Sequence, residues 1–168
     1  IVECSLAQHV IPSSETRIKI DRLESITVEF RTPVNLVDPY KKSRFKRFLP
    51  LPGILFSYNI GELLEADRSS PVYMNAVNLV NRVLNETYSV LDTVKKTMYI
   101  YDGDEIPGII GYVKYFIDWN FIDEDIKFFI ENILEHASVM GVGSGRANGF
   151  GHITIKLPEQ YSSPTMMR

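Results

Sequence analysis

A glycine-rich stretch at residues 141–151 (GVGSGRANGFG) holds five of the ten glycines in the 168-residue chain. Glycine lets successive backbone N–H groups turn toward one concavity, and it lets a ligand approach the backbone without a Cβ in the way. Arg146 and Asn148 add a guanidinium fork and an amide, which suit phosphate oxygens or base edges. A helix-to-strand turn needs a glycine only at the helix C-cap. We therefore interpret the stretch as a phosphate-binding site.

The stretch does not fit the fingerprints of nucleotide-binding loops. No Gly-Lys-Ser/Thr follows it, and Asn148 stands where the dinucleotide fingerprint requires a glycine. It also follows the C-terminus of a predicted helix, where the helix dipole disfavours phosphate. Binding must then rely on backbone amides and Arg146, which favours an extended polyanion over one small phosphate.

A basic run at residues 41–47 is the second candidate site, with five positive charges in seven residues. The whole chain has a net charge of −3 and would have −8 without this run. A concentrated positive patch on an acidic surface is what phosphate contacts require, although a solvated loop is the alternative. Phe45 within the run could stack on a base. Three basic residues on predicted strands could extend the patch: Arg31, Lys95 and Lys114.

Composition excludes several classes of protein. The single cysteine, Cys4, excludes an internal disulfide and a cysteine-rich metal site. No apolar run approaches the roughly 20 residues that a membrane span needs, and no signal peptide is visible. Hydrophobic residues make up 45% of the chain, which suffices for a core. We expect a cytoplasmic protein without a metal ion, a cofactor or contact with a membrane.

Hydrophobic periodicity gives the elements that must position these residues. It predicts strands over Ile26–Pro33, Val94–Tyr101, Ile109–Ile117 and Phe150–Leu157, and helices over Gly53–Glu65, Pro71–Ser89 and Asp123–Met140. The order βαββαβ predicts an α+β, ferredoxin-like (RRM-like) fold, a four-stranded antiparallel sheet with its helices on one face. We expect one such domain over residues 25–158 with a helical insertion around 40–70, a linker or remnant of a preceding domain over 1–24, and a tail over 159–168.

The glycine stretch and the strand after it resemble the C-terminal signature of the RAMP superfamily of CRISPR proteins. The chain looks most like the CRISPR repeat-cleaving endoribonucleases of that superfamily. Three further segments fit this branch: Phe30–Pro33, Ile110–Val113 and Ala137–Met140. The resemblance covers roughly residues 25–157.

The resemblance implies a protein that cleaves CRISPR precursor RNA within the repeat, without metal, by attack of a ribose 2′-hydroxyl on the adjacent phosphate. It implies CRISPR repeat RNA as the ligand, a preceding ferredoxin-like domain in the same protein, and other CRISPR complex subunits as further partners. On this basis the predicted RNA-binding residues are Gly141, Gly143, Ser144, Gly145, Arg146, Asn148 and Gly149, together with Lys41, Lys42, Arg44, Lys46 and Arg47.

The catalytic residues stay unknown. In many members of this branch a histidine acts with a tyrosine or lysine of the first domain, and those positions have no counterpart here. His9 is best explained as an exposed bystander and His136 by the dipole of its helix. His152 could line an RNA surface. Two alternatives stay open: a non-catalytic RAMP subunit on guide RNA in an interference complex, and a ferredoxin-like module for a small ligand or protein.

Overall fold

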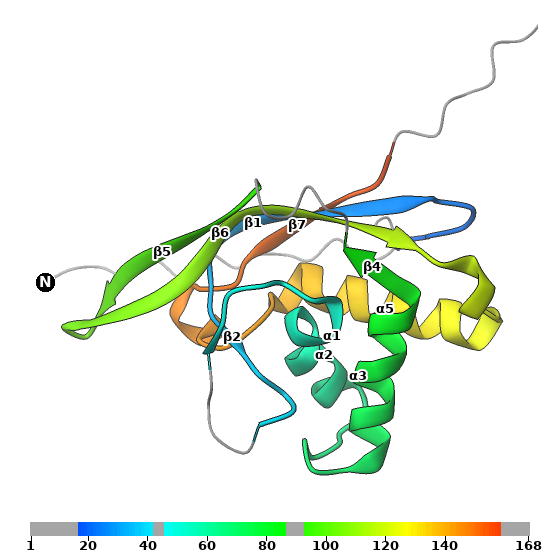
Figure 1. Cartoon of the computed structure of the whole chain (residues 1–168), viewed down its shortest axis with the longest axis horizontal. Coiled ribbons are helices and arrows are strands. Elements are labelled where there is room, and N and C mark those ends of the chain that lie inside the picture. The colour runs from blue at the N-terminus through cyan, green and yellow to red at the C-terminus, as the bar shows by residue number, and fades with distance from the viewer. Residues whose placement is uncertain (1–16, 42–45, 87–92, 159–168) are drawn as a thin grey trace, which may run out of the picture.

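The computed structural model describes residues 17–41, 46–86 and 93–158. Five strands form the main sheet: β1 (Ser25–Val34), β4 (Leu84–Glu86), β5 (Val94–Tyr101), β6 (Asp104–Ile117) and β7 (Ile153–Lys156). Their order is β4-β6-β1-β7, β5 also pairs with β6, and every pair is antiparallel. This is the predicted ferredoxin-like order (Figure 1), with one strand of the plan divided in two.

The divided strand consists of β4 and β5. β4 pairs with the end of β6, from Tyr115 to Ile117, and β5 pairs with its beginning, from Asp104 to Gly111. β1 pairs with β6 at both places, so β4 and β5 share the other edge. The predicted strand Val94–Tyr101 is therefore confirmed as β5, whereas the short strand β4 before it was not predicted.

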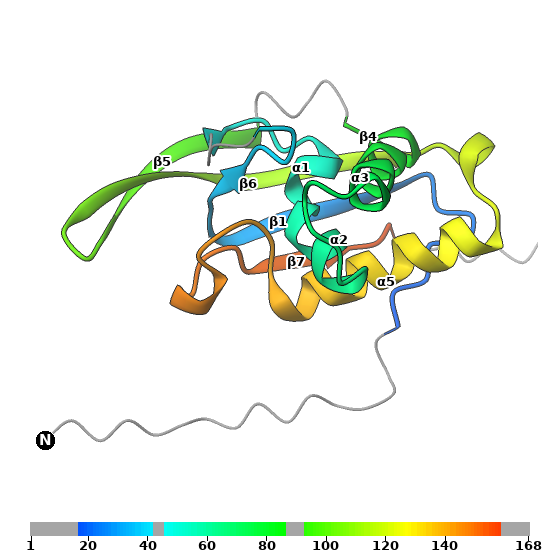
Figure 2. The same cartoon turned by 90° about the horizontal axis from the view of Figure 1, so that it is seen from below.

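The helices lie on one face of the sheet (Figures 1 and 2). They are α1 (Pro52–Leu55), α2 (Ser57–Leu63), α3 (Pro71–Val83) and α5 (Glu124–Met140), with 3₁₀ turns η1 (Trp119–Phe121) and η2 (Arg146–Asn148). Ser70 caps α3, and Asp123 caps α5 by accepting from the Ile126 amide at 2.8 Å. The stretch around 40–70, where we expected a helical insertion, holds α1, α2 and the strand β3 (Lys46–Arg47). β3 pairs with β2 (Leu36–Val37), which precedes that stretch, in a separate two-stranded sheet.

Four predicted boundaries differ. The helix expected over 53–65 divides at Phe56, whose ψ of 7° interrupts it. The helix expected to reach Ser89 ends at Val83, because Leu84 is buried in the core and the chain then pairs with β6; Ser89 lies outside the described residues. β6 begins at Asp104, five residues before the predicted start, since a hairpin pairs it with β5. β7 covers only Ile153–Lys156 of the last predicted strand.

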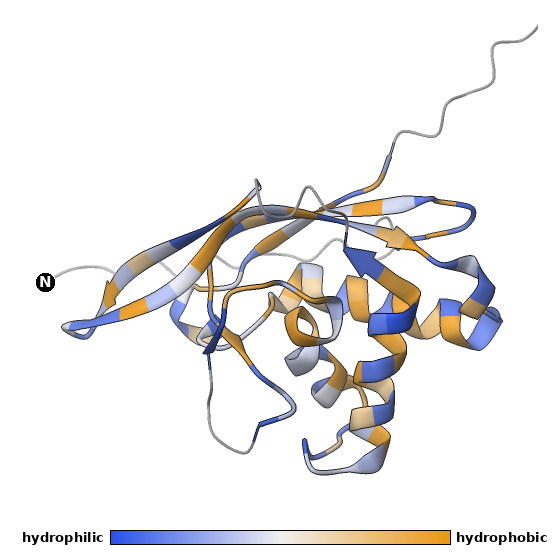
Figure 3. Cartoon of the chain, in the orientation of Figure 1, coloured by the Kyte–Doolittle hydropathy of each residue, from blue (hydrophilic) through white to orange (hydrophobic). Residues whose placement is uncertain are grey.

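The core lies between the sheet and the helices, where apolar segments face one another (Figure 3). Alternation along β1 and β6 buries one set of side chains and exposes the next, as expected for a sheet covered on one face. The buried set includes Ile26, Val28, Val113, Tyr115, Val77, Val80, Ile133 and Leu134.

Residues 17–24, which we expected to be a linker or remnant, pack on α5. Ile20 is fully buried and Leu23 is 7% exposed. The buried carboxylate of Glu131 accepts from the Ile20 amide at 3.1 Å, and Glu135 accepts from the Ile18 amide at 3.0 Å. The hydrophobic core therefore extends into this segment. Residues 1–16 and 159–168 lie outside the described residues, so the preceding domain and the tail stay predictions.

Among the helices of the described residues, none is long and apolar enough to cross a membrane.

Candidate nucleic-acid interface

The glycine stretch runs from the end of α5 to β7 and folds back on the end of β1 (Figure 2). The Val142 amide donates to the Gly151 carbonyl at 2.8 Å, which ties the two ends of the stretch together. The Gly151 amide donates to the Pro33 carbonyl at 3.0 Å, and the Ser144 amide donates to the Asn35 carbonyl at 2.9 Å. Backbone hydrogen bonds thus fix the stretch against a central strand.

The backbone conformation of the stretch explains its glycines. All five have positive φ, between 70° and 84°. A Cβ on Gly143 would lie 2.6 Å from the Asn35 carbonyl oxygen, and one on Gly151 would lie 2.0 Å from the Val142 carbonyl oxygen. Their number therefore has a conformational cause, and the expectation that this helix-to-strand turn needs a glycine only at the helix C-cap is wrong. Any case for a ligand must rest on other features.

Four amides of the stretch supply such a feature. Within residues 17–41, 46–86 and 93–158, no group accepts a hydrogen bond from the amides of Gly143, Gly145, Arg146 or Ala147. The same residues line a pocket of about 590 Å³, together with Ser144, Tyr58, Val139, Met140 and His152. Unpaired N–H groups beside a concavity are suited to an anion, so the predicted residues Gly143–Arg146 do meet at one surface.

Arg146 is already paired with a carboxylate of α2. Its Nη1 donates to Glu62 Oε2 at 3.0 Å, and its Nη2 donates to Glu62 Oε1. The arginine side chain is 17% exposed, and its guanidinium holds the pKa of Glu62 below the usual value. His136 Nε2 lies 3.5 Å from the same carboxylate. Arg146 therefore fastens the stretch to α2.

Asn59, also on α2, connects His136 to the start of the stretch. Its Nδ2 lies 3.0 Å from His136 Nδ1 and donates to the Gly141 carbonyl at 2.9 Å. His136 thus has a structural role, as expected, although its partners are side chains of α2 in addition to the helix end. His9 lies outside the described residues.

The basic run meets the stretch at Asn35. Lys46 Nζ donates to Asn35 Oδ1 at 2.7 Å, while the backbone carbonyl of Asn35 accepts from Ser144. Arg47, by contrast, pairs with the fully buried Asp38, its Nε lying 2.7 Å from Oδ2. Lys41 is exposed, and Lys42, Arg44 and Phe45 lie outside the described residues. The structure therefore brings Lys46 beside the stretch and gives Arg47 a structural partner.

The remaining predicted residues divide between the stretch and the open face of the sheet. Asn148 and Gly149 are exposed at the tip of the stretch. Phe150 stacks on Tyr99 with ring centroids 4.1 Å apart, which gives this tyrosine a packing role. On the open face, Lys114 lies between exposed Tyr112 and Phe116 on β6, and Lys95 pairs with exposed Ile110.

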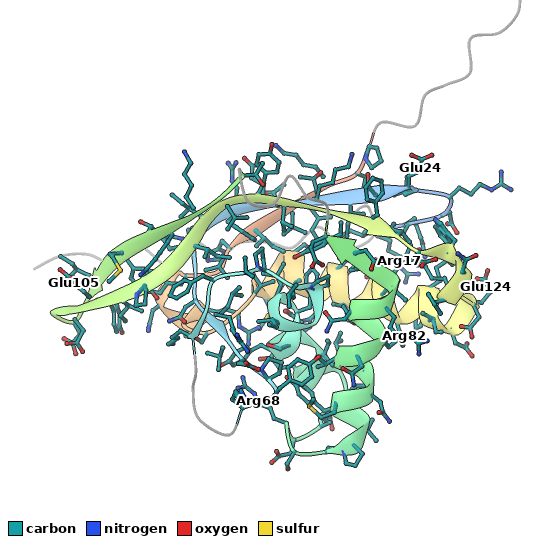
Figure 4. The ribbon with its side chains drawn as sticks, in the orientation of Figure 1. Arg17, Glu24, Arg68, Arg82, Glu105 and Glu124 are labelled. Atoms are coloured by element: carbon teal, nitrogen blue, oxygen red, sulfur yellow. The ribbon has the colours of Figure 1, made fainter. Side chains whose placement is uncertain are left out.

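Sequence reasoning missed Tyr58, Glu62 and Asn35. None belongs to a basic run or a glycine motif, and each reaches the site only through folding of distant segments. Arg68, on the helical side of the sheet (Figure 4), has its Cζ 4.2 Å from the centroid of the Tyr58 ring. No group of three or more metal-binding side chains occurs among the described residues.

The family model for the CRISPR-associated endoribonuclease Cas6 matches residues 28–153. This chain belongs to the Cas6 family. The resemblance to CRISPR repeat-cleaving endoribonucleases is therefore confirmed. No curated protein matches the sequence.

Solved Cas6 structures share the fold. Thermus thermophilus Cas6 (TTHB231) aligns with a TM-score of 0.59 at 15% identity, over 80% of this chain and 54% of its own. Cas6 (TTHA0078), in its product complex, aligns with a TM-score of 0.55 at 13% identity, over 79% of this chain and 51% of its own. The chain thus spans about half the length of the Cas6 structures it matches, and such identities show the fold alone.

Substitution of Gly151 by alanine tests the docking of the stretch in this Cas6-family domain. The new Cβ would meet the Val142 carbonyl, so we expect Gly151→Ala to lower the free energy of unfolding by more than about 2 kcal/mol. Gly149 has a similar φ of +83°, but a Cβ there meets nothing within 4 Å. Gly149→Ala should cost only about 1 kcal/mol. Equal losses in urea unfolding would contradict the docking.

Substitution of Glu62 tests the ion pair with Arg146. The folded-state pKa of Glu62 lies below its ordinary value of 4.5, because Arg146 donates to it. Its stabilising contribution is therefore present above about pH 4.5 and lost as the pH falls through the folded pKa. We expect Glu62→Gln to reduce stability at pH 7, and this difference should shrink as the pH falls through the folded pKa of Glu62. Exposed Glu24 provides the control, and a stability difference that does not change as the pH falls would exclude a charge effect.

Proposed function

We propose that this Cas6-family domain binds the backbone of CRISPR repeat RNA, and that the complete protein cleaves precursor RNA within the repeat. The observation that carries the proposal is the convergence of Lys46 and the glycine stretch on Asn35. Two segments more than 90 residues apart thereby present a cation and a group of amide donors at neighbouring positions. Family membership supplies the chemical class of the ligand.

The amides of the stretch contribute hydrogen-bond donors for the oxygens of a phosphate diester. They are neutral donors on a backbone fixed by hydrogen bonds, so they can contact phosphate oxygens without reorganising. Lys46 adds a positive charge for a neighbouring phosphate. Neither group reads the base directly, so both would position the RNA along this surface.

Cleavage by a ribose 2′-hydroxyl requires a general base, a general acid and donors for the charge that develops on the phosphorane. We assign the third role to the amides of the stretch. His152 lines the same pocket, and we assign it to the RNA surface. We place the base and the acid in the part of the protein that lies outside this chain. Because the family is one of endoribonucleases, we favour this function over a non-catalytic guide-RNA subunit.

Filter binding of a labelled CRISPR repeat RNA at several salt concentrations tests the RNA interface. We expect affinity to fall with salt, because bound phosphates release counterions. Lys46→Gln should weaken binding to all sequences and reduce the salt slope by about 0.7, the value of one phosphate contact on a single strand. Arg17→Ala provides the control, since Arg17 lies beside the middle of α5, next to Phe128 and Glu131, and does not line the pocket of the stretch (Figure 4). Binding without a salt slope would contradict the interface.

Cleavage by the protein from the complete reading frame tests the enzymatic role. We expect repeat RNA to be cut within the repeat in EDTA, leaving a 2′,3′-cyclic phosphate or its hydrolysis product, because the attacking group is the ribose hydroxyl. A substrate with a 2′-deoxy nucleotide before the cleaved bond should bind and stay intact. RNA that is bound but never cut would support the non-catalytic subunit, and cutting of the 2′-deoxy substrate would exclude this mechanism.

A further inference from the structure

The pocket beside the glycine stretch has two chemically different walls. One wall is formed by residues 143–147 and carries the four amides that donate to no group of the described residues. The other wall is formed by Tyr58, Val139 and Met140. A site that held only phosphate would need the first wall and would gain nothing from the second.

Val139 and Met140 lie beyond the buried face of α5. The helix buries Ile133, Leu134 and Ala137 against the sheet, whereas Val139 is 55% exposed and Met140 is 50% exposed. Single exposed apolar side chains are ordinary on protein surfaces. Here two of them adjoin an aromatic ring and a set of hydrogen-bond donors in one pocket, which is the combination that small-molecule sites have.

Tyr58 adds an aromatic surface with associated cations. The Arg146 Cζ lies 5.5 Å from the centroid of its ring, and the Arg68 Cζ lies 4.2 Å from it. Nucleobases stack on aromatic rings and on guanidinium planes in single-stranded RNA recognition. The second wall is therefore suited to the face of a base.

We propose that this pocket binds one unpaired nucleotide of the RNA, with its phosphate on the amides of residues 143–147 and its base against Tyr58, Val139 and Met140. This inference rests on the proposed function and names the part of the RNA that the site takes. The volume of about 590 Å³ suits a nucleotide, since ligand pockets span about 300–1,000 Å³.

The end of α5 fixes the orientation of that nucleotide. Val139 and Met140 are the last two residues of the helix, whose C-terminal end carries partial negative charge. This charge repels a phosphate from the second wall and leaves the amide wall as its place. A base within a duplex is stacked on both faces and paired along one edge, so only an unpaired base can enter the pocket.

Abasic RNA combined with pocket variants tests the proposal. The probes are the single-stranded repeat RNA and a series in which each nucleotide in turn lacks its base. The variants are Val139→Ala/Met140→Ala and a matched control, Val72→Ala/Met98→Ala, whose residues are 61% and 49% exposed and lie outside the pocket. All four positions are exposed, so folding should be retained, which thermal unfolding checks.

We expect the unsubstituted chain to lose about tenfold in affinity at one abasic position. The pocket variant should bind intact RNA about tenfold more weakly and lose nothing further at that position, whereas the control should behave like the unsubstituted chain. A pocket variant that binds intact RNA like the control would overturn the proposal, as would equal losses at all abasic positions. Salt-dependent binding in those cases would leave the phosphate-binding function standing. Binding that does not depend on salt would refute both the nucleotide pocket and the proposed phosphate-binding function.

Discussion

The docking of the glycine stretch on the end of β1 is the constraint on which the rest of the site depends. β1 pairs with both β6 and β7, so Pro33 and Asn35 extend from the most constrained strand of the sheet. Two backbone hydrogen bonds to these residues, and a third within the stretch, set its path. That path leaves no room for a Cβ at Gly143 or Gly151. It also brings the Ser144 amide of the stretch and Lys46 to one asparagine, Asn35, which makes two separate segments into one surface.

Charge compensation decides which groups of this surface can attract RNA. Arg146 is paired with Glu62, Arg47 with Asp38, and Lys156 with Glu29. The positive charge of each of these three side chains is therefore compensated by a carboxylate of the same domain. Among the described residues, the amides of Gly143, Gly145, Arg146 and Ala147 donate to no group, while Lys46 donates to the uncharged amide oxygen of Asn35. Neutral donors on a fixed backbone need no excess of cations, so the proposed RNA-binding surface is compatible with a net charge of −3. It also limits the salt dependence that the domain alone can show.

The fold was predictable from the sequence to a greater extent than the site. Side chains alternate along β1 and β6 with the strand period, and apolar residues recur along α3 and α5 with the helix period, so local patterns indicated these elements. The glycine after Met140 ends α5 as expected. The division of the second strand was not predictable, because Val80, Val83 and Leu84 continue a helical pattern that pairing with β6 overrides. The Glu62–Arg146 pair joins residues 84 positions apart, and no local spacing indicates such a contact. The glycines misled for a related reason, since only the folded chain shows that a Cβ at Gly143 would meet the Asn35 carbonyl and one at Gly151 would meet the Val142 carbonyl.

Because most cations of this surface are paired with carboxylates, the two walls of the pocket become important for recognition of the RNA. A surface that binds RNA mainly through cations gains affinity for every phosphate alike, and its selectivity must come from elsewhere. A surface with few free cations has less of that general affinity. A base held against Tyr58, Val139 and Met140 would add affinity at one nucleotide instead. The free energy of binding would then be concentrated where the RNA is unpaired. Because attack by a 2′-hydroxyl requires the adjacent phosphate to be held in line, a nucleotide fixed at both its base and its phosphate is also the arrangement that such chemistry needs.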